Sequence, residues 1–200
     1  MRSPALCVFV AVLVCVGLLA IASETKKEPE FVSSKKCKVC HSKPKLGGAE
    51  YLKWQKGPHA GAYKSLLTER GKEVAAMAGV ADPLDPEKCL RCHITTLKFE
   101  KESQRAEGIG CEGCHGPGSL YRKKSVMEDY EASLKVGLRK IKGDTPEETM
   151  KNIEKQCREC HGLEHKEENP TAQEFKMEEF WAKVKHDEET LKEQFPEAFK

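Results

Sequence analysis

The chain has 200 residues; 33% are charged, 38% are hydrophobic, and the formal net charge is +2. This length fits one domain, but the apolar content is low for a well-filled core of aliphatic side chains. Basic and acidic residues nearly balance and the lysines are scattered, so the composition gives no support to nucleic-acid binding. Something other than aliphatic side chains must fill the interior, and the ten cysteines are the first hint of what it is.

The first 22 residues have the pattern of a signal peptide. Arg2 precedes an uninterrupted apolar run, Ala5 to Leu19, and residues 20–22 are Ala-Ile-Ala, a typical cleavage site. The alternative is an uncleaved membrane anchor, because the apolar run is close to spanning length. Cleavage would remove Cys7 and Cys15. We therefore expect a periplasmic or otherwise extracytoplasmic protein that is bound to a membrane only if this segment is retained.

The remaining chain predicts a mainly α fold, with short helices and long loops. Residues 23–34 are charged and are expected to form a flexible leader, residues 35–186 the folded domain, and residues 187–200 an exposed, charged helix or tail. Apolar and polar residues nowhere alternate over a length that would predict a strand.

Helical spacing of apolar residues predicts three helical stretches in chain order. They cover residues 50–56, residues 60–78 (as one helix or two) and residues 125–136. Each is followed directly by a glycine, the residue that most often ends a helix.

Capping residues predict three further helix starts. Asp85 can cap a short helix with Pro86 at its first position. Thr145 and Thr171 each begin a capping box, in which a threonine is followed three residues later by glutamate. The first box starts a helix that runs toward residue 157, and the second starts one that ends near His186.

All cysteines after the expected cleavage site belong to C-x-x-C-H units, at residues 37–41, 89–93, 111–115 and 157–161. We call these the first to fourth motifs. Their cysteines are Cys37, Cys40, Cys89, Cys92, Cys111, Cys114, Cys157 and Cys160, and their histidines are His41, His93, His115 and His161. This spacing lets two thiols bind the vinyl groups of one porphyrin while the histidine becomes the proximal iron ligand. The sequence therefore predicts four covalently bound c-type haems.

Two other readings of the cysteines are a disulfide framework and structural zinc sites. Neither explains why a histidine follows every C-x-x-C pair at the same offset. Export also disfavours zinc-thiolate sites, because exposed thiols oxidise outside the cytoplasm. Haem attachment is the interpretation that accounts for all four motifs.

Counting histidines limits how the irons can be coordinated. Of the seven histidines, four are in the motifs, and His59, His165 and His186 remain. At most three haems can thus have two histidine ligands from this chain. At least one iron needs another ligand, a partner subunit's residue or an open position, and an open iron can bind small molecules.

Several segments resemble the tetrahaem cytochrome c-554 family, from about Phe31 to His186. They are residues 35–41, residues 54–60 with the W-x(4)-H pattern, the G-C-E-G-C-H-G-P-G segment 110–118, and residues 175–179 and 184–186. The W-x(4)-H and G-C-E-x-C-H-G-P-G segments are much more specific than the C-x-x-C-H units alone.

The resemblance implies a set of distal ligands. It places His59 opposite His115 and His186 opposite His161, and it leaves the iron of His93 five-coordinate. For the first haem, the family has a distal histidine shortly after the third motif, where this chain has none. Met127 is the nearest replacement, with Lys123 or Lys124 as weaker candidates. The family suggests no role for His165, which is expected to be solvated.

Two functions fit these features. The first is an electron carrier that exchanges electrons with other redox proteins in a respiratory or nitrogen-metabolism chain, and the second is a reductase of small nitrogen-oxide species, such as nitric oxide, at an open haem. The carrier is favoured because no acid–base group surrounds His93 in the sequence. A haem filament with ligands donated between subunits is a third arrangement that no feature selects. Lysines around the first motif could dock an acidic partner or offset haem propionates.

Overall fold

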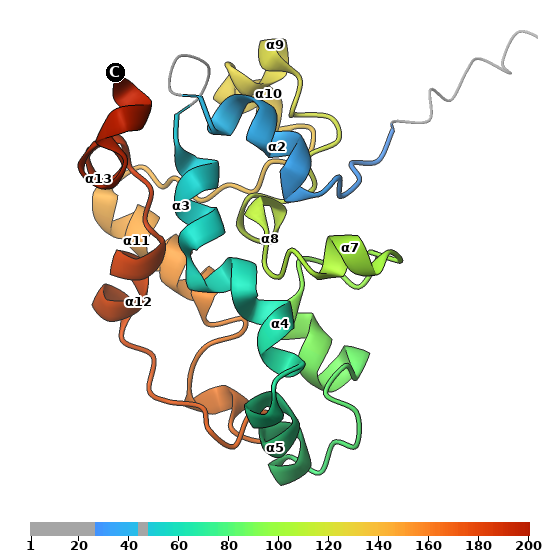
Figure 1. The fold of residues 1–200 in the computed structure, drawn as a ribbon. Helices are drawn as coiled ribbons and strands as arrows, with labels where there is room; N and C mark the ends of the chain where they lie inside the picture. Colours follow the sequence, from blue (N-terminus) through green and yellow to red (C-terminus); the bar gives the residue numbers. More distant parts are fainter. Residues whose placement is uncertain (1–26, 44–47) are drawn as a thin grey trace, which may run out of the picture.

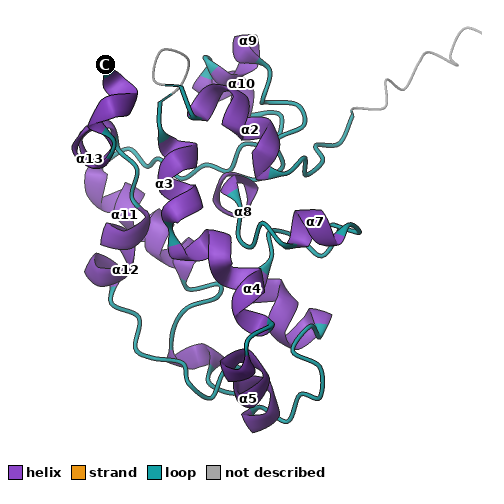
Figure 2. Cartoon of the chain, in the orientation of Figure 1, coloured by secondary structure: helices purple, strands orange, loops and turns teal. Residues whose placement is uncertain are grey.

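The computed structural model describes residues 27–43 and 48–200 (Figure 1). The expected signal peptide, with Cys7 and Cys15, lies outside these residues. Throughout the described part every regular element is helical and no strand occurs, which confirms the mainly α fold (Figure 2). None of the helices in these two ranges has both the length and the apolar character needed to cross a bilayer.

The helices are short and follow one another in the order of Figure 1, with α3 and α4 running through the middle of the view. The α-helices are α2 (Ser34–His41), α3 (Glu50–Lys56), α4 (Ala62–Leu66), α5 (Glu69–Met77), α6 (Arg91–His93), α7 (Glu102–Arg105), α8 (Cys111–His115), α9 (Lys124–Met127), α10 (Tyr130–Leu134), α11 (Pro146–Cys157), α12 (Met177–Val184) and α13 (Glu188–Gln194). The other helical turns are η1 (Pro58–Gly61), η2 (Pro86–Leu90), η3 (Leu163–His165) and η4 (Pro196–Phe199).

Most of the expected helix starts are confirmed by hydrogen bonds. The Asp85 carboxylate accepts from the backbone N–H groups of Glu87 and Lys88, at 2.9 and 2.8 Å. The Thr145 hydroxyl accepts from the N–H of Glu148 at 3.1 Å, which satisfies one of the N–H groups that a helix start leaves without a partner. Residues 50–56 form α3 as expected, and Gly79 follows α5 with a φ of 71°, which favours glycine.

Two expected helices differ from the structure. The stretch 125–136 is two helices, because the Asp129 carboxylate accepts from the N–H of Ala132 at 3.0 Å and starts α10 afresh. The predicted capping box at Thr171 is wrong. Its hydroxyl and N–H instead donate to the side chain of Asn169, at 2.7 and 3.1 Å, and α12 begins only at Met177. A local side-chain turn thus replaces the expected cap.

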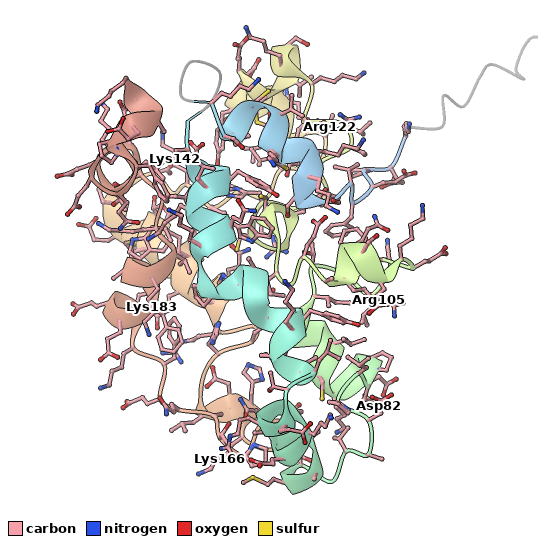
Figure 3. All side chains as sticks on the ribbon, viewed as in Figure 1. Asp82, Arg105, Arg122, Lys142, Lys166 and Lys183 are labelled. Atoms are coloured by element: carbon pink, nitrogen blue, oxygen red, sulfur yellow. The ribbon has the colours of Figure 1, made fainter. Side chains whose placement is uncertain are left out.

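The apolar core of the described residues is small. Its main cluster consists of Tyr63, Leu66, Leu90 and Ile94, beside the second motif. Charged and polar side chains, among them Asp82, Arg122 and Lys166, project outward over the rest of the molecule (Figure 3). This agrees with the low apolar content and leaves much of the stabilisation to other interactions.

The Glu112 carboxylate provides one such interaction from inside the third motif. Its side chain is only 1% exposed and accepts hydrogen bonds from the N–H groups of Val32 at 2.9 Å, Ser33 at 2.8 Å and Gly118 at 2.7 Å. Hydrogen bonds to a buried carboxylate are stronger than those between neutral groups. Glu112 therefore fixes the chain before the first motif onto the third motif.

A second buried carboxylate, Glu107, reinforces this connection. It accepts from the Ser33 hydroxyl at 2.6 Å and from the N–H of Ser34 at 2.8 Å. Ser33 has a φ of 82°, a left-handed conformation that is rare for residues other than glycine and is held here by these bonds. Residues 32–34 are thus held in place, although their position in the charged segment 23–34 predicted a flexible leader.

The C-terminal segment is also packed. Residues 188–194 form α13, in which Leu191 is 2% exposed, and the Lys53 ammonium donates to the side-chain carbonyl of Gln194 at 2.8 Å. Most side chains of residues 187–200 are exposed, as the charged sequence predicted, but Thr190 and Leu191 of α13 are buried.

We predict that Glu112→Ala destabilises the protein by at least about 3 kcal/mol, because three backbone N–H groups lose a buried acceptor. Thermal or urea unfolding of the haem-loaded protein would measure this loss. The matched control is Glu69→Ala, whose side chain is 85% exposed and pairs with Lys72, and it should change stability little. A Glu112→Ala protein as stable as the control would contradict the role assigned to the carboxylate.

Candidate haem-binding site

Each C-x-x-C-H motif is carried by a short helix or by the end of one. The first lies on α2, the second on η2 and α6, and the third on α8. The fourth begins at the last residue of α11, and the N–H groups of Cys160 and His161 both donate to the carbonyl of Cys157, which continues the helical turn. The eight described cysteines are all free thiols. In each motif, the turn therefore keeps two thiols and a histidine together, as haem attachment requires.

The first motif contacts the third. The thiols of Cys37 and Cys111 are neighbours, and their mutual influence raises the pKa of Cys37 and lowers that of Cys111 to about 7. The N–H of Cys111 also donates to the Ser34 hydroxyl at 3.1 Å. These contacts join α2 to α8, in addition to the buried glutamates.

The second motif contacts the fourth in the same manner. The thiols of Cys92 and Cys160 are neighbours, and their mutual influence lowers the pKa of Cys92 to about 7 and raises that of Cys160. An ion pair between Arg91 and Glu168, at 2.7 Å, lies beside this contact.

Helix α11 connects these two halves. The Gln156 side-chain amide donates to the carbonyl of Cys114 at 2.8 Å and to that of Gly113 at 3.3 Å. Gln156 directly precedes the fourth motif, so this bond fixes the fourth motif against the third. The motifs are consequently in contact in the order first, third, fourth, second.

Two pairs of histidine rings approach one another at the spacing that a shared iron needs, one pair tilted at 38° and the other edge-on at 70°. The ring centroids of His59 and His161 are 6.0 Å apart, and those of His115 and His186 are also 6.0 Å apart. Two imidazoles that each place a nitrogen about 2 Å from one metal ion have ring centres roughly 6 Å apart. The residues therefore fit an iron held between two histidines at the third and fourth motifs.

These ring pairs differ from the pairing that the family resemblance implied. His59 faces His161, not His115, and His186 faces His115, not His161. The backbone of His59 does lie beside the third motif, where its carbonyl accepts from the N–H of Ile109 at 3.0 Å. Its side chain, however, is directed to the fourth motif, and sequence proximity could not predict this direction.

Burial favours the neutral form of three of the four paired rings. Desolvation lowers the pKa of His115 to about 4 and also lowers the pKa values of His59 and His161. A neutral imidazole is the form that binds a metal ion. For His186, the Nδ1–H donates to the carbonyl of Val184 at 3.0 Å, which leaves Nε2 free for a ligand.

The histidines of the first and second motifs are oriented by different acceptors. The Nδ1–H of His93 donates to the backbone carbonyl of Ala62 at 2.7 Å. Nδ1 of His41 lies 3.3 Å from a carboxylate oxygen of Glu50, and this hydrogen bond raises the pKa of His41. In both cases Nε2 is left free to bind an iron.

The remaining candidate ligands do not form a ring pair with a motif histidine. His165 uses its Nε2–H to donate to the carbonyl of Arg158 at 2.8 Å, which favours a structural role. Met127 lies at the end of α9 with 37% of its surface exposed, and its ligation of the first haem stays a prediction, as do the weaker alternatives Lys123 and Lys124.

Sequence reasoning missed the residues that position the motifs. Glu107, Glu112 and Gln156 do so through hydrogen bonds, and their spacing in the sequence does not indicate this function. The His161 ring also packs against Phe175, with centroids 6.1 Å apart and an interplanar angle of 27°, and against Phe180 at 5.0 Å. Of these side chains, Glu112 and Phe175 lie in family-like segments.

Short helices that carry C-x-x-C-H units, together with facing histidines at an iron-sized spacing, define a c-type cytochrome that acts as an electron carrier. The family model "Cytochrome c554 and c-prime" matches residues 36–116, a span that contains the first three motifs. A curated relative, cytochrome c-554 of Nitrosomonas europaea, is 26% identical over 168 residues, which are 75% of this chain and 68% of the relative. No solved structure matches the chain. Over these ranges the chain is similar to the cytochrome c554 family.

We predict that His186→Ala removes one of two ligands from an iron and converts that iron from low spin to high spin. Electron paramagnetic resonance of the oxidised protein would show one additional high-spin signal. The matched control is His165→Ala, which removes a histidine bonded only to a backbone carbonyl and should leave the spin states unchanged. If the two variants give the same spectrum, the assignment of His186 is wrong.

Proposed function

We propose that the mature chain binds four c-type haems and conducts electrons between redox proteins outside the cytoplasm. The observation that carries this proposal is the continuous series of contacts between the motifs. Each haem, when bound, supplies an iron that takes up and releases one electron. The chain's own residues attach, orient and space these groups.

The attachment residues are the eight cysteines of the four motifs, and the proximal ligands are His41, His93, His115 and His161. The distal ligands are His186 for the third motif and His59 for the fourth, as the two 6.0 Å ring separations support. The two central sites of the series thus have a histidine on both faces. A six-coordinate iron of this kind passes electrons without binding substrate.

The two ends of the series differ from its centre. His59 and His186 each lie next to a motif histidine, and Nε2 of His165 is bonded to the carbonyl of Arg158. The seven histidines therefore leave no evident second ligand for the irons that His41 and His93 would bind. This supports an open position at the second motif and Met127 as a ligand at the first. An open position also supports the second candidate function, a reductase of small nitrogen-oxide species at the second motif.

Export and partner choice complete the proposal. Residues 1–22 act as a signal peptide, and residues 35–186 form the haem-binding domain, with residues 187–200 packed against it through α13. Lys35, Lys36 and Lys38 are exposed on α2, beside the first motif. This positive surface suits an acidic redox partner at that end of the series.

We predict four haems per chain, because every cysteine of the mature protein lies in an attachment motif. A pyridine haemochrome assay of the purified, exported protein would measure the ratio. Zinc in place of haem, or fewer than four haems, would contradict the proposal. With four haems present, carbon monoxide binding to about one reduced haem in four would indicate an open site, and catalytic turnover of nitric oxide there would favour the reductase over the carrier.

We predict that Met127→Ala changes either the spin state or the reduction potential of one haem, since it removes a thioether ligand from the first iron. Redox titration followed by visible absorption would detect the change. Met77→Ala is a suitable control, because Met77 is also an exposed methionine on a short helix. Four haems with unchanged spin states and potentials would eliminate Met127 as a ligand.

A further inference from the structure

The first motif has a feature that distinguishes it from the others, namely the contact between His41 and Glu50. Nδ1 of His41 lies 3.3 Å from Oε2 of Glu50, and both side chains are about 30% exposed, at 31% and 29%. Glu50 is the first residue of α3, and α3 packs against α2, which carries His41. The carboxylate is therefore held at the back of the ring that would bind the first iron.

The backbone leaves room for this carboxylate. Gly48 has a φ of 121°, a conformation that favours glycine, and a Cβ at this position would overlap both carboxylate oxygens of Glu50. The absence of a side chain at Gly48 thus allows Glu50 to fold back toward His41. Two separate features of the chain, a glycine and a helix start, determine where the carboxylate lies.

Other expected ligand histidines have a neutral acceptor at Nδ1, in contrast to the carboxylate at His41. His93 and His186 donate to the backbone carbonyls of Ala62 and Val184, at 2.7 and 3.0 Å. A carbonyl is a neutral acceptor, whereas a carboxylate carries a full charge and draws the Nδ1 proton more strongly. A histidine polarised in this way is a more basic ligand and stabilises oxidised iron relative to reduced iron.

We propose that Glu50 is a positioning residue that lowers the reduction potential of the haem attached to the first motif. This inference rests on the proposed function, since it requires a haem at that motif. A low potential at one end of the series favours electron entry there and transfer toward the third, fourth and second motifs. The exposed lysines beside the first motif would then mark the docking surface of the electron donor.

The test is Glu50→Gln, which keeps the size of the side chain and removes its charge. Spectroelectrochemical titration of the haem-loaded protein should show one of the four potentials shifted upward, with the other three nearly unchanged. Glu69→Gln, an exposed carboxylate on α5, is the matched control and should shift none. Gly48→Ala should raise the same potential as Glu50→Gln, because the added Cβ displaces the carboxylate from His41.

The possible failures are distinguishable. A wild-type chain with fewer than four haems would overturn the proposed function. Four haems and potentials that stay unchanged in both Glu50→Gln and Gly48→Ala would overturn only the assignment of Glu50. A shift in one variant and not in the other would also contradict it, since both remove the same charged acceptor.

Discussion

The hydrogen bonds of the buried Glu112 carboxylate are the interaction on which the rest of the structure depends. Glu112 lies between the two cysteines of the third motif, yet it accepts from the N–H groups of Val32 and Ser33, just before the first motif. A chain with so small an apolar core cannot rely on burial of aliphatic groups to bring distant segments together. Charge-assisted hydrogen bonds to the backbone fulfil this function here.

From this anchor, contacts between motifs extend through the molecule. Cys37 lies near Cys111, Gln156 bonds to the third motif, and Cys160 lies near Cys92. A series of attachment sites in direct contact suits electron transfer, in which spacing matters more than a substrate pocket. The series also explains the low apolar content, since bound porphyrins would supply the large hydrophobic surfaces that the side chains lack.

Local rules predicted the local structure well where the competing interactions were also local. Asp85 and Thr145 cap helices as expected, because a cap depends on residues within one turn. Thr171 failed because the nearby Asn169 captures its hydroxyl, and the stretch 125–136 divided because Asp129 makes a second cap. Ring pairing was beyond such rules: His59 is close to the third motif along the backbone, but its side chain faces the fourth.

The sequence by itself determined the chemistry of this protein, because C-x-x-C-H spacing defines covalent haem attachment within a single helical turn and seven histidines limit the coordination of the irons. It also indicated a family resemblance and the helical fold. Only the tertiary structure decided which histidines face one another, that residues 32–34 are fixed by Glu107 and Glu112, and that the motifs make contact in the order first, third, fourth, second. The physical reason is that these features depend on side chains far apart in the chain, whose directions no local spacing specifies.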